Sequence, residues 1–372
     1  MELIRFCDYT FKYPDAENNA LNNINLVVNQ GEFVTVCGKS GSGKSTLLKS
    51  MKPDITPHGK ASGKILFCGE ESSGEVNYNK IGFVMQNPHS QIVTDKVWHE
   101  LAFGLENMGM NNDQMCVRVA EIASFFGIES WFHMDTGELS GGQKQILNLA
   151  SVMVMEPEVL VLDEPTSQLD PISADNFLEI LNKINKELGT AVVISEHRCS
   201  EVFAYSDRII VVGDGEIVAY DVQKNMAKKL KNHDMFEALP SYMQIYEVVD
   251  GGDNCPQNIP EARRWLEKYT QNCDACAVYL GREDKRTFNE TALSVKDLRY
   301  KYDKNSKYVL SGLFMEVKKG EIFGILGGNG SGKSTLLWLI SKGIKMQGGK
   351  RKYRDFVGRN TGIGTGKKLF AE

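Results

Sequence analysis

A long internal repeat is the feature of this sequence that most limits its possible folds. The stretch FKYPDAENNALNNINLVVNQGEFVTVCGKSGSGKSTLL begins at Phe11, and YKYDKNSKYVLSGLFMEVKKGEIFGILGGNGSGKSTLL begins at Tyr300. The two stretches align without a gap at an offset of 289 positions, which pairs Gly38 with Gly327. Self-similarity at a fixed spacing indicates a duplicated structural unit. The sequence therefore predicts two copies of one domain type in tandem.

Each copy contains a glycine-rich loop of the form G-x-x-x-x-G-K-[ST], which is GKSGSGKST in the first copy and GGNGSGKST in the second. Each loop follows an apolar run and precedes an expected helix, which is the context that a phosphate-binding loop requires. Backbone N–H groups of such a loop wrap phosphates, and the helix N-terminus adds positive potential. We expect Lys44 to reach the β- and γ-phosphates of ATP and Ser45 to ligate Mg²⁺. The residues predicted to bind the nucleotide are Gly38, Gly41, Gly43, Lys44, Ser45 and Thr46, and in the second copy Gly327, Gly332, Lys333, Ser334 and Thr335.

Two adjacent acids, Asp163 and Glu164, end the apolar run VLVLDE. Ligands of open α/β sheets bind at the carboxyl ends of the strands, where these acids should lie. Asp163 is the candidate to hold Mg²⁺, directly or through water, and Glu164 is the candidate base for the attacking water. A positioned general base contributes about 10²–10⁴-fold to the rate. Two surface acids at a strand end are the plainer interpretation.

Further polar residues stand at the ends of expected elements. Gln86 and His197 each follow an apolar run, and such residues often have no function. Tyr13 and Tyr302 precede the two loops at the same register and could stack on adenine or lie in the core. The segment ELSGGQKQ should begin a helix and could bind an anion there, although an ordinary glycine turn has the same pattern. Its candidate binding residues are Ser140, Gly141, Gly142 and Gln143.

The alternation of apolar runs and helical patterns predicts an α/β fold. EFVTVCG, VLVLDE, AVVIS and RIIVVG suit buried strands, and SADNFLEILNKINKEL has apolar residues at helical spacing. A mostly parallel sheet surrounded by helices follows. We predict a complete first domain over 1–221, a partly helical linker over 222–290, the N-terminal part of a second domain over 291–347, and a basic tail over 348–372.

Charge and hydropathy exclude some classes of function. The net charge of -5 gives no support for coating nucleic acid. The sequence has no apolar run of about 18 residues, the length that a membrane-spanning helix needs. The segment MELIRFCDYTFKY lacks the continuous apolar core of a signal peptide. We therefore expect a chain that stays in the cytoplasm and reaches a membrane only through partner subunits.

Together these motifs resemble the ATP-binding subunits of ABC transporters, which are P-loop NTPases with a helical subdomain. The resemblance implies that ATP lies between two domains, one of which supplies the loop, the acids, Gln86 and His197, while the other supplies the signature. It gives Gln86 and His197 catalytic roles, makes Gln86 a metal ligand as well, and places Asp170 near the nucleotide. The corresponding segments are Walker A at Gly38–Thr46, the Q-loop at Gln86, the signature at Leu139–Gln143, Walker B at Val159–Glu164, the D-loop at Ser167–Asp170 and the switch His197.

A finer resemblance concerns the segment QNPHSQIVTDKVWHELAFGLENMG that starts at Gln86. It is similar to tandem ATPases of the energy-coupling factor class, which import vitamins and transition-metal ions, and so are LPSYMQI and EARRWL further along. This implies a transmembrane coupling subunit that contacts the region after Gln86, a substrate-capture subunit, and a location on the cytoplasmic face of the membrane. The second ATPase domain would come from homodimerisation or from a separate ATPase. The alternatives are a soluble ABC ATPase acting on ribosomes or DNA, and a non-catalytic fragment.

The second copy contains the loop but none of the later motifs, because the counterpart of Gln86 would fall beyond residue 372. After Gly348 basic residues outnumber acids, and apolar runs that would form strands are absent. We interpret the second copy as truncated, with 348–372 disordered or aberrant. A short regulatory half-domain is the alternative. In both cases the second loop should not turn over ATP in cis.

Overall fold

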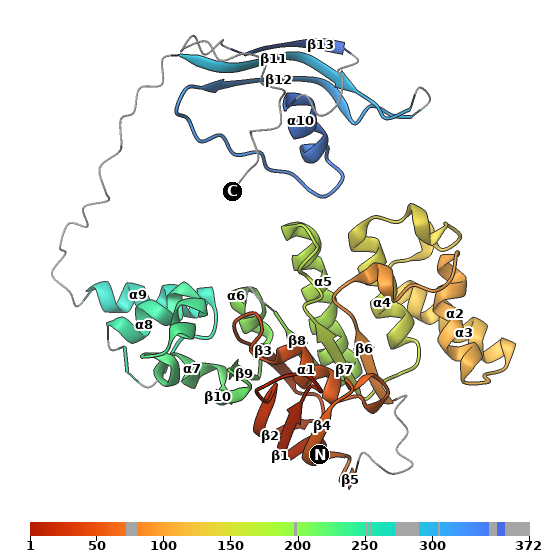
Figure 1. Ribbon diagram of the computed structural model, residues 1–372, viewed down its shortest axis with the longest axis vertical. Coiled ribbons are helices and arrows are strands. Elements are labelled where there is room, and N and C mark those ends of the chain that lie inside the picture. The colour runs from red at the N-terminus through yellow and green to blue at the C-terminus, as the bar shows by residue number, and fades with distance from the viewer. Residues whose placement is uncertain are drawn as a thin grey trace. The chain divides into compact units, whose positions relative to one another are not determined.

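The computed structural model describes most of the chain and divides it into two compact units, Met1–Ala275 and Cys276–Glu372, coloured along the chain in Figure 1. Each unit is described by itself. The described residues are 1–71, 80–196, 199–249, 251–252, 254–271, 290–303, 306–341 and 348–353.

A six-stranded sheet forms the centre of the first unit. Its order is β10-β9-β3-β8-β7-β6, and β10 is antiparallel to β9 whereas the other neighbours are parallel. The predicted apolar runs form β3, β7, β8 and β9, and successive side chains of β7 and β8 alternate between two cores, as strand geometry requires. The strands are β3 (Phe33–Cys37), β6 (Ile81–Val84), β7 (Val159–Asp163), β8 (Ala191–Ser195), β9 (Arg208–Gly213) and β10 (Glu216–Val222).

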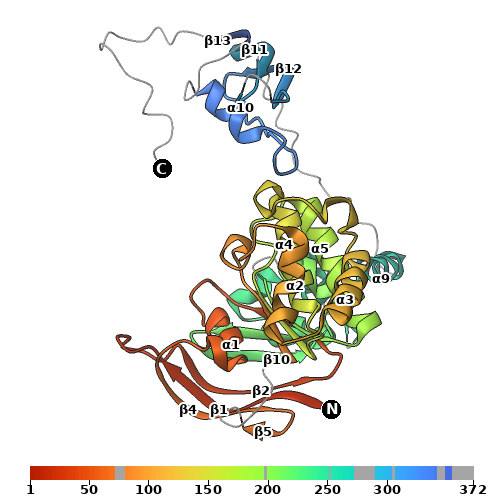
Figure 2. The same cartoon turned by 90° about the vertical axis from the view of Figure 1, so that its right-hand side faces the viewer.

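A second, antiparallel sheet covers one side of this centre. Its order is β2-β1-β4-β5, and Figure 2 shows it as a separate layer of the first unit. Helix α1 (Lys44–Ser50) buries Leu47 and Leu48 in the core shared by the two sheets. Burying a leucine side chain is worth about 1.5–3 kcal/mol, so this core anchors the helix that follows the loop. The strands are β1 (Glu2–Lys12), β2 (Leu21–Asn29), β4 (Lys60–Phe67) and β5 (Glu70–Glu71).

Helices cover the other face of the six-stranded sheet. Three of them, α2, α3 and α4, pack on one another and form the predicted helical subdomain. Helix α4 begins after Ser140, whose hydroxyl accepts the Gln143 N–H in a capping box, and α5 begins after the N-cap Asp170. The helices are α2 (Val97–Asn107), α3 (Asn112–Phe125), α4 (Gly141–Met153) and α5 (Pro171–Lys183), the last continued by the π-helix η6 (Ile184–Leu188). Shorter elements are η1 (Pro53–Ile55), η3 (Pro88–Ser90), η4 (Glu129–Trp131), η5 (Thr136–Glu138), α6 (Cys199–Val202) and η7 (Phe203–Tyr205).

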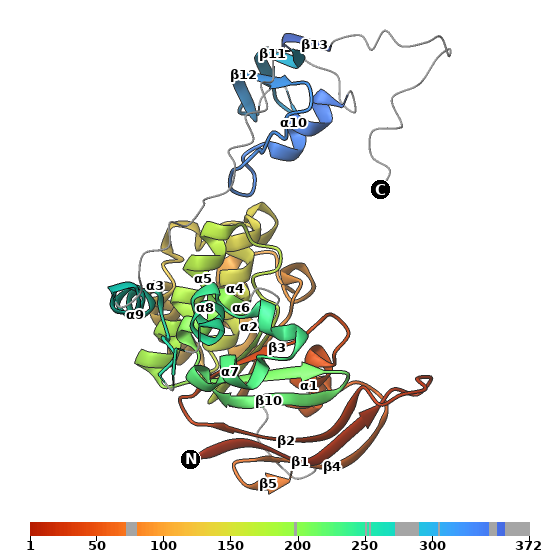
Figure 3. The ribbon, with the colours of Figure 1, turned by 90° about the vertical axis from the view of Figure 1, so that its left-hand side faces the viewer.

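Most of the segment predicted as a linker, the described residues between 222 and 271, is part of the first unit. Met226 and Met243 are buried in a core that also contains Val211 of β9, and Figure 3 shows α7 beside β10. The first unit therefore continues beyond the predicted boundary at residue 221, because these helices bury apolar side chains against it. They are α7 (Gln223–Leu230), η8 (Asp234–Ala238), α8 (Ser241–Val248) and α9 (Ile259–Gln271).

The second unit repeats only part of the first. Its sheet order, β12-β11-β13, matches β2-β1-β4 of the first copy. The prediction of a structureless tail from residue 348 was wrong for 348–353, because β13 pairs with β11 through its backbone; residues 354–372 lie outside the described residues. The elements are β11 (Thr291–Tyr300), β12 (Leu310–Lys318), α10 (Lys333–Ile340) and β13 (Gly348–Tyr353). No helix in the described part of the chain is long and apolar enough to cross a membrane.

Candidate nucleotide-binding site

The first glycine-rich loop joins β3 to α1 in a conformation that needs glycine. Gly38 has φ +157°, and a Cβ there would lie 2.3 Å from the Val212 carbonyl oxygen. Gly43 has φ +105°, and a Cβ would lie 2.6 Å from the Ala20 carbonyl oxygen. Both the backbone conformation and the close contacts therefore exclude a larger residue. The helix N-terminus that follows directs its unpaired N–H groups to the same place.

The loop surrounds the ammonium group of Lys44, which is buried. Its Nζ donates to the carbonyl oxygens of Gly38 at 2.9 Å and Lys39 at 3.0 Å. It also lies 3.9 Å from Glu164 Oε1. The lysine is thus held inside the loop, with its charge beside the place where the loop geometry would accept phosphates.

The predicted metal ligands and the two acids meet at the carboxyl edge of the sheet. The Ser45 hydroxyl donates to Asp163 Oδ1 at 3.0 Å. The Gln86 amide nitrogen donates to Glu164 Oε2 at 2.8 Å. The parallel strands β3, β7 and β6 end at this edge, which explains why residues so distant in sequence become neighbours. Hydroxyl, carboxylate and amide oxygens are suitable Mg²⁺ ligands, and the adjacent oxygens of Ser45 and Asp163 fit one cation.

Tyr13 lies beside the same loop. Its hydroxyl is 3.0 Å from Thr46 Oγ1, and its ring packs edge-on against Phe11 at 5.0 Å between centroids. The side chain is 37% exposed, so it is not a fully buried core residue. An exposed ring held in this way is suited to stacking on a base.

The signature residues Ser140, Gly141, Gly142 and Gln143 lie at the start of α4, which packs on α2 and α3. The capping box occupies both the hydroxyl of Ser140 and the side-chain oxygen of Gln143. Asp170 likewise caps the helix α5, because its carboxylate accepts a hydrogen bond from the Ser173 N–H at 3.1 Å. These three side chains therefore have local structural roles in addition to the predicted nucleotide contacts. The switch His197 lies outside the described residues.

Sequence reasoning missed two residues at the end of β8. Ser195 lies opposite Asp163 in the parallel pair β7–β8, and its hydroxyl donates to Asp163 Oδ1 at 2.9 Å. Glu196 follows it and is 3% exposed. The run AVVIS, read in register with VLVLD, would have placed both residues at the same sheet edge as the acids.

The second loop has nearly the same local geometry as the first. Lys333 Nζ donates to the carbonyl oxygens of Gly327 at 2.5 Å and Gly328 at 2.7 Å. The Tyr302 hydroxyl is 2.8 Å from Thr335 Oγ1. Ser334, predicted as a nucleotide contact, is the second residue of α10. The sequence has no counterpart of Asp163 or Glu164 in this copy.

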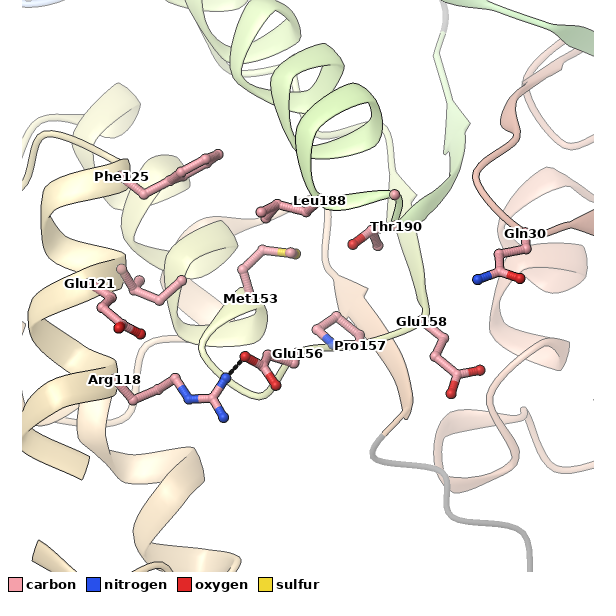
Figure 4. A pocket seen from close by; sticks show the side chains of 12 residues that line it. Gln30, Arg118, Glu121, Phe125, Met153, Glu156, Pro157, Glu158, Leu188 and Thr190 are labelled. Carbon is pink, nitrogen blue, oxygen red and sulfur yellow. Dashed lines mark ion pairs between the residues drawn. The ribbon is translucent and has the colours of Figure 1, made fainter. Parts of the chain in front are cut away.

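A cavity of about 430 Å³ lies at the opposite edge of the sheet and is separate from this site. It is lined by residues that precede strands, such as Pro157 before β7 and Thr190 before β8. Figure 4 shows Met153 and Leu188 beside it, with Arg118 and Glu156 forming an ion pair. Because phosphates bind at the carboxyl ends of parallel strands, this cavity is not the nucleotide site.

Comparison with known proteins identifies the family. The family model described as ABC transporter matches residues 21–167 and 310–360, more than half of the chain. The chain belongs to the ABC transporter family. Its P-loop fold of the ABC ATPase type is therefore confirmed, and the first unit carries an ATP-binding ATPase domain of this family.

Curated relatives align with nearly the whole of this chain. An ABC transporter ATP-binding protein of Bacillus thuringiensis is 38% identical over 94% of this chain and 63% of its own length. One of Methanosarcina mazei is 33% identical over 90% of this chain and 60% of its own length. The chain thus spans less than two thirds of these curated relatives.

Two solved structures resemble the first unit. CbiO1 of Clostridium perfringens, part of the ABC transporter complex CbiONQ, has a TM-score of 0.57 and 31% identity, and covers 66% of this chain and 99% of its own. A dimeric ATP-binding cassette in a post-hydrolysis state with ADP and phosphate has a TM-score of 0.53 and 26% identity, and covers 59% of this chain and 99% of its own.

Proposed function

We propose that the first domain hydrolyses ATP with Mg²⁺ and energises a membrane importer for a micronutrient, either a vitamin or a transition-metal ion. One observation supports the proposed ATP hydrolysis: five side chains suited to it gather at the first glycine-rich loop. They are Lys44, Ser45, Gln86, Asp163 and Glu164. The importer class is supported by the 31% identity to CbiO1, which is part of the ABC transporter complex CbiONQ.

The chemistry follows from the residues at the loop. Lys44 would turn its donors from loop carbonyls to phosphate oxygens, and Ser45 and Asp163 would hold the cation with Gln86 as a further ligand. Mg²⁺, when bound, neutralises charge that develops on the transferred phosphoryl group. Glu164 accepts the proton of the attacking water while the bond between the γ-phosphorus and the ADP oxygen breaks. The products are ADP and phosphate, with the proton on Glu164.

Hydrolysis should require two signature-bearing domains, supplied by two chains or by a separate ATPase. The sequence contains one Ser-Gly-Gly-Gln segment, at Ser140–Gln143 in the first copy. A similar cassette at 26% identity is a dimer. We therefore expect the specific ATPase activity of the purified full chain to fall on dilution as dimers dissociate. Activity per molecule that stays constant down to monomeric samples would contradict this requirement.

The region after Gln86 is the proposed contact for a transmembrane coupling subunit. A cavity of about 330 Å³ there is lined by Val93 and Met108 together with residues of α2 and α4. Val93 is 69% exposed and Trp98 is 42% exposed. Apolar side chains around a hollow surface suit an apolar partner segment. This contact would place the chain on the cytoplasmic face of the membrane.

The partner contact can be tested in native membranes. The tagged full chain should co-purify with a polytopic membrane subunit and a substrate-capture subunit after mild crosslinking. Val93→Asp should reduce this recovery while leaving ATPase activity of the isolated chain unchanged. Uptake assays with labelled vitamins and transition-metal ions then identify the cargo. Unchanged recovery with Val93→Asp would contradict the proposed surface.

A further inference from the structure

The turn that presents Glu164 is held by residues of β8. Glu164 has φ +47°, a left-handed conformation that a non-glycine residue keeps only where its surroundings fix it. Its N–H donates to the Ser195 carbonyl oxygen at 3.1 Å and to the Ser195 hydroxyl at 3.0 Å. The turn is closed by Ser167, whose hydroxyl donates to the Glu164 carbonyl oxygen at 2.8 Å.

Glu196 holds the middle of the same turn. Its Oε1 accepts the Thr166 N–H at 3.1 Å. This bond ties the residue two positions after the candidate base to the end of β8. Ser195 thus binds the backbone of Glu164 at the end of β7, and Glu196 binds the backbone of Thr166 in the turn that follows. A shift of Thr166 would therefore be transmitted to Glu164.

The environment of Glu196 is unusual for a carboxyl. Burial raises its pKa to about 7, and the nearby carboxylates of Glu164 and Glu201 act in the same direction, whereas the bond from Thr166 opposes them. The Cys199 thiol donates to the Glu196 backbone carbonyl at 3.3 Å. Burying a carboxyl among like charges costs stability, and such groups concentrate at functional sites.

We propose that Glu196 is a positioning residue for ATP hydrolysis, which orients Glu164 by accepting the Thr166 N–H. The inference rests on the proposed function, because it concerns the base of the same site. The ionised carboxylate accepts a stronger hydrogen bond than the neutral acid. Turnover should therefore rise with pH as Glu196 ionises.

The first test compares three variants of the full chain in steady-state hydrolysis. Glu196→Ala removes the acceptor and should lower kcat by about 10- to 100-fold, as expected for a displaced catalytic group, with little change in the ATP concentration at half-maximal rate. Glu196→Gln keeps a neutral acceptor oxygen and should recover activity to about the level of wild type at low pH, where Glu196 is protonated. Glu201→Gln, which changes another carboxylate of the small cavity of about 170 Å³ that Glu196 and Thr166 line, is the matched control. A kcat of Glu196→Ala within twofold of wild type, or no recovery in Glu196→Gln, would overturn the proposal.

The pH profile separates positioning from a general loss of structure. Wild-type kcat should contain a step near pH 7 that Glu196→Gln lacks and Glu201→Gln retains. Among the described residues, the titratable groups near this carboxyl are Glu164, Glu201 and the Cys199 thiol. A step that persists unchanged in Glu196→Gln would assign it to another group and overturn this part of the inference.

Amide hydrogen exchange gives a readout that does not depend on activity. The Thr166 N–H should exchange about tenfold faster in Glu196→Ala, equivalent to losing one hydrogen bond, and near the wild-type rate in Glu196→Gln. Equal protection in Glu196→Ala and wild type would overturn the proposal. If the wild-type chain has no ATPase activity in any partner complex, the proposed function fails, and the exchange result still decides whether Glu196 fixes the turn.

Discussion

The two nucleotide loops of this chain are alike in themselves and differ in what surrounds them. Gly38 and Gly327 both have φ +157°. Lys44 and Lys333 both donate to two carbonyl oxygens of their own loop. Each of these contacts is made within seven residues of sequence, so each copy can form its loop from local interactions alone.

The surroundings of the loops depend on distant parts of the chain. In the first copy Val34 and Val36 are fully buried in β3, which lies between β8 and β9. Their counterparts in the second copy are Phe323 and Ile325, in a segment that forms no strand among the described residues, and Phe323 is 45% exposed. The 372-residue sequence contains no counterpart of β8 or β9 in the second copy. A loop can therefore take its shape without the sheet that delivers the acids to it.

The largest expected effect tests whether turnover belongs to the first loop alone. Glu164→Gln should keep ATP binding and lower turnover by about 10²–10⁴-fold, because the amide cannot accept the proton of water. The measurement is steady-state ATP hydrolysis beside nucleotide binding, with Glu121→Gln at the opposite sheet edge as control. Turnover within twofold of wild type would remove Glu164 from the mechanism.

The next comparison uses the two lysines directly. Lys44→Ala should lower hydrolysis by about 10²-fold or more, since a positioned cation next to the transferred phosphate is lost. Lys333→Ala should leave hydrolysis within about twofold, because phosphoryl transfer needs a metal-holding acid that the second copy lacks in this sequence. Both are assayed in the same partner complex. An equal loss in Lys333→Ala would show a working second site completed by another chain.

Matched leucines test the difference in packing. Leu48 is fully buried, and its counterpart Leu337 is 44% exposed. Leu48→Ala should lower the free energy of unfolding of the first unit by about 2–5 kcal/mol, as for a leucine removed from a core. Leu337→Ala should change the second unit by less than about 1 kcal/mol. Urea unfolding monitored by hydrogen exchange measures the free energy of unfolding of each unit. Similar losses of stability in Leu48→Ala and Leu337→Ala would contradict the difference in packing.

The pH dependence of unfolding tests the buried carboxyl of Glu196 in the first unit. The pKa of Glu196 is raised from 4.5 to about 7 in the folded chain. The folded state therefore holds a proton that the unfolded state releases, so stability falls as pH rises from about 4.5 to 7 and then levels off. Glu196→Gln removes this loss of stability. Its free energy of unfolding should therefore exceed that of wild type by a difference that grows between pH 4.5 and 7 to about 3 kcal/mol. Melting temperatures of wild type and Glu196→Gln are measured at pH 4 and pH 8. A change between the two pH values that is equal in both proteins would contradict this prediction.

The smallest effect concerns the tyrosines that both copies share. Tyr13→Phe and Tyr302→Phe each remove one hydroxyl bond to a threonine, worth about 0.5–1.5 kcal/mol. Since the rings remain, ATP affinity of the first loop should change by less than about threefold, equivalent to 0.7 kcal/mol. Equilibrium binding of ATP checks this. A loss in Tyr13→Phe that exceeds tenfold would mean that the hydroxyl itself orients the nucleotide.

Much of the fold and of the candidate site followed from patterns in the sequence. The strand leading to Gly38, the helix capped by Ser140 and the acids at the end of β7 all form as predicted. The domain bounds 1–221 stay a prediction, while the packing of α7 and α8 on the first unit was not foreseen, because their apolar spacing does not reveal which surface they cover. The structureless reading of 348–353 was wrong because β13 is paired with β11 through its backbone.

The sequence by itself determined the duplication, the two loops and the residue types that ATP chemistry needs, because these depend on short spacings and on glycine at particular positions. Only the tertiary structure decided which distant groups meet. The parallel register that sets Asp163 beside Ser195 joins segments more than 30 residues apart and brings Glu196 to the turn after Glu164. Sheet order and register arise from burial summed over the whole unit, and no local stretch of residues contains that information.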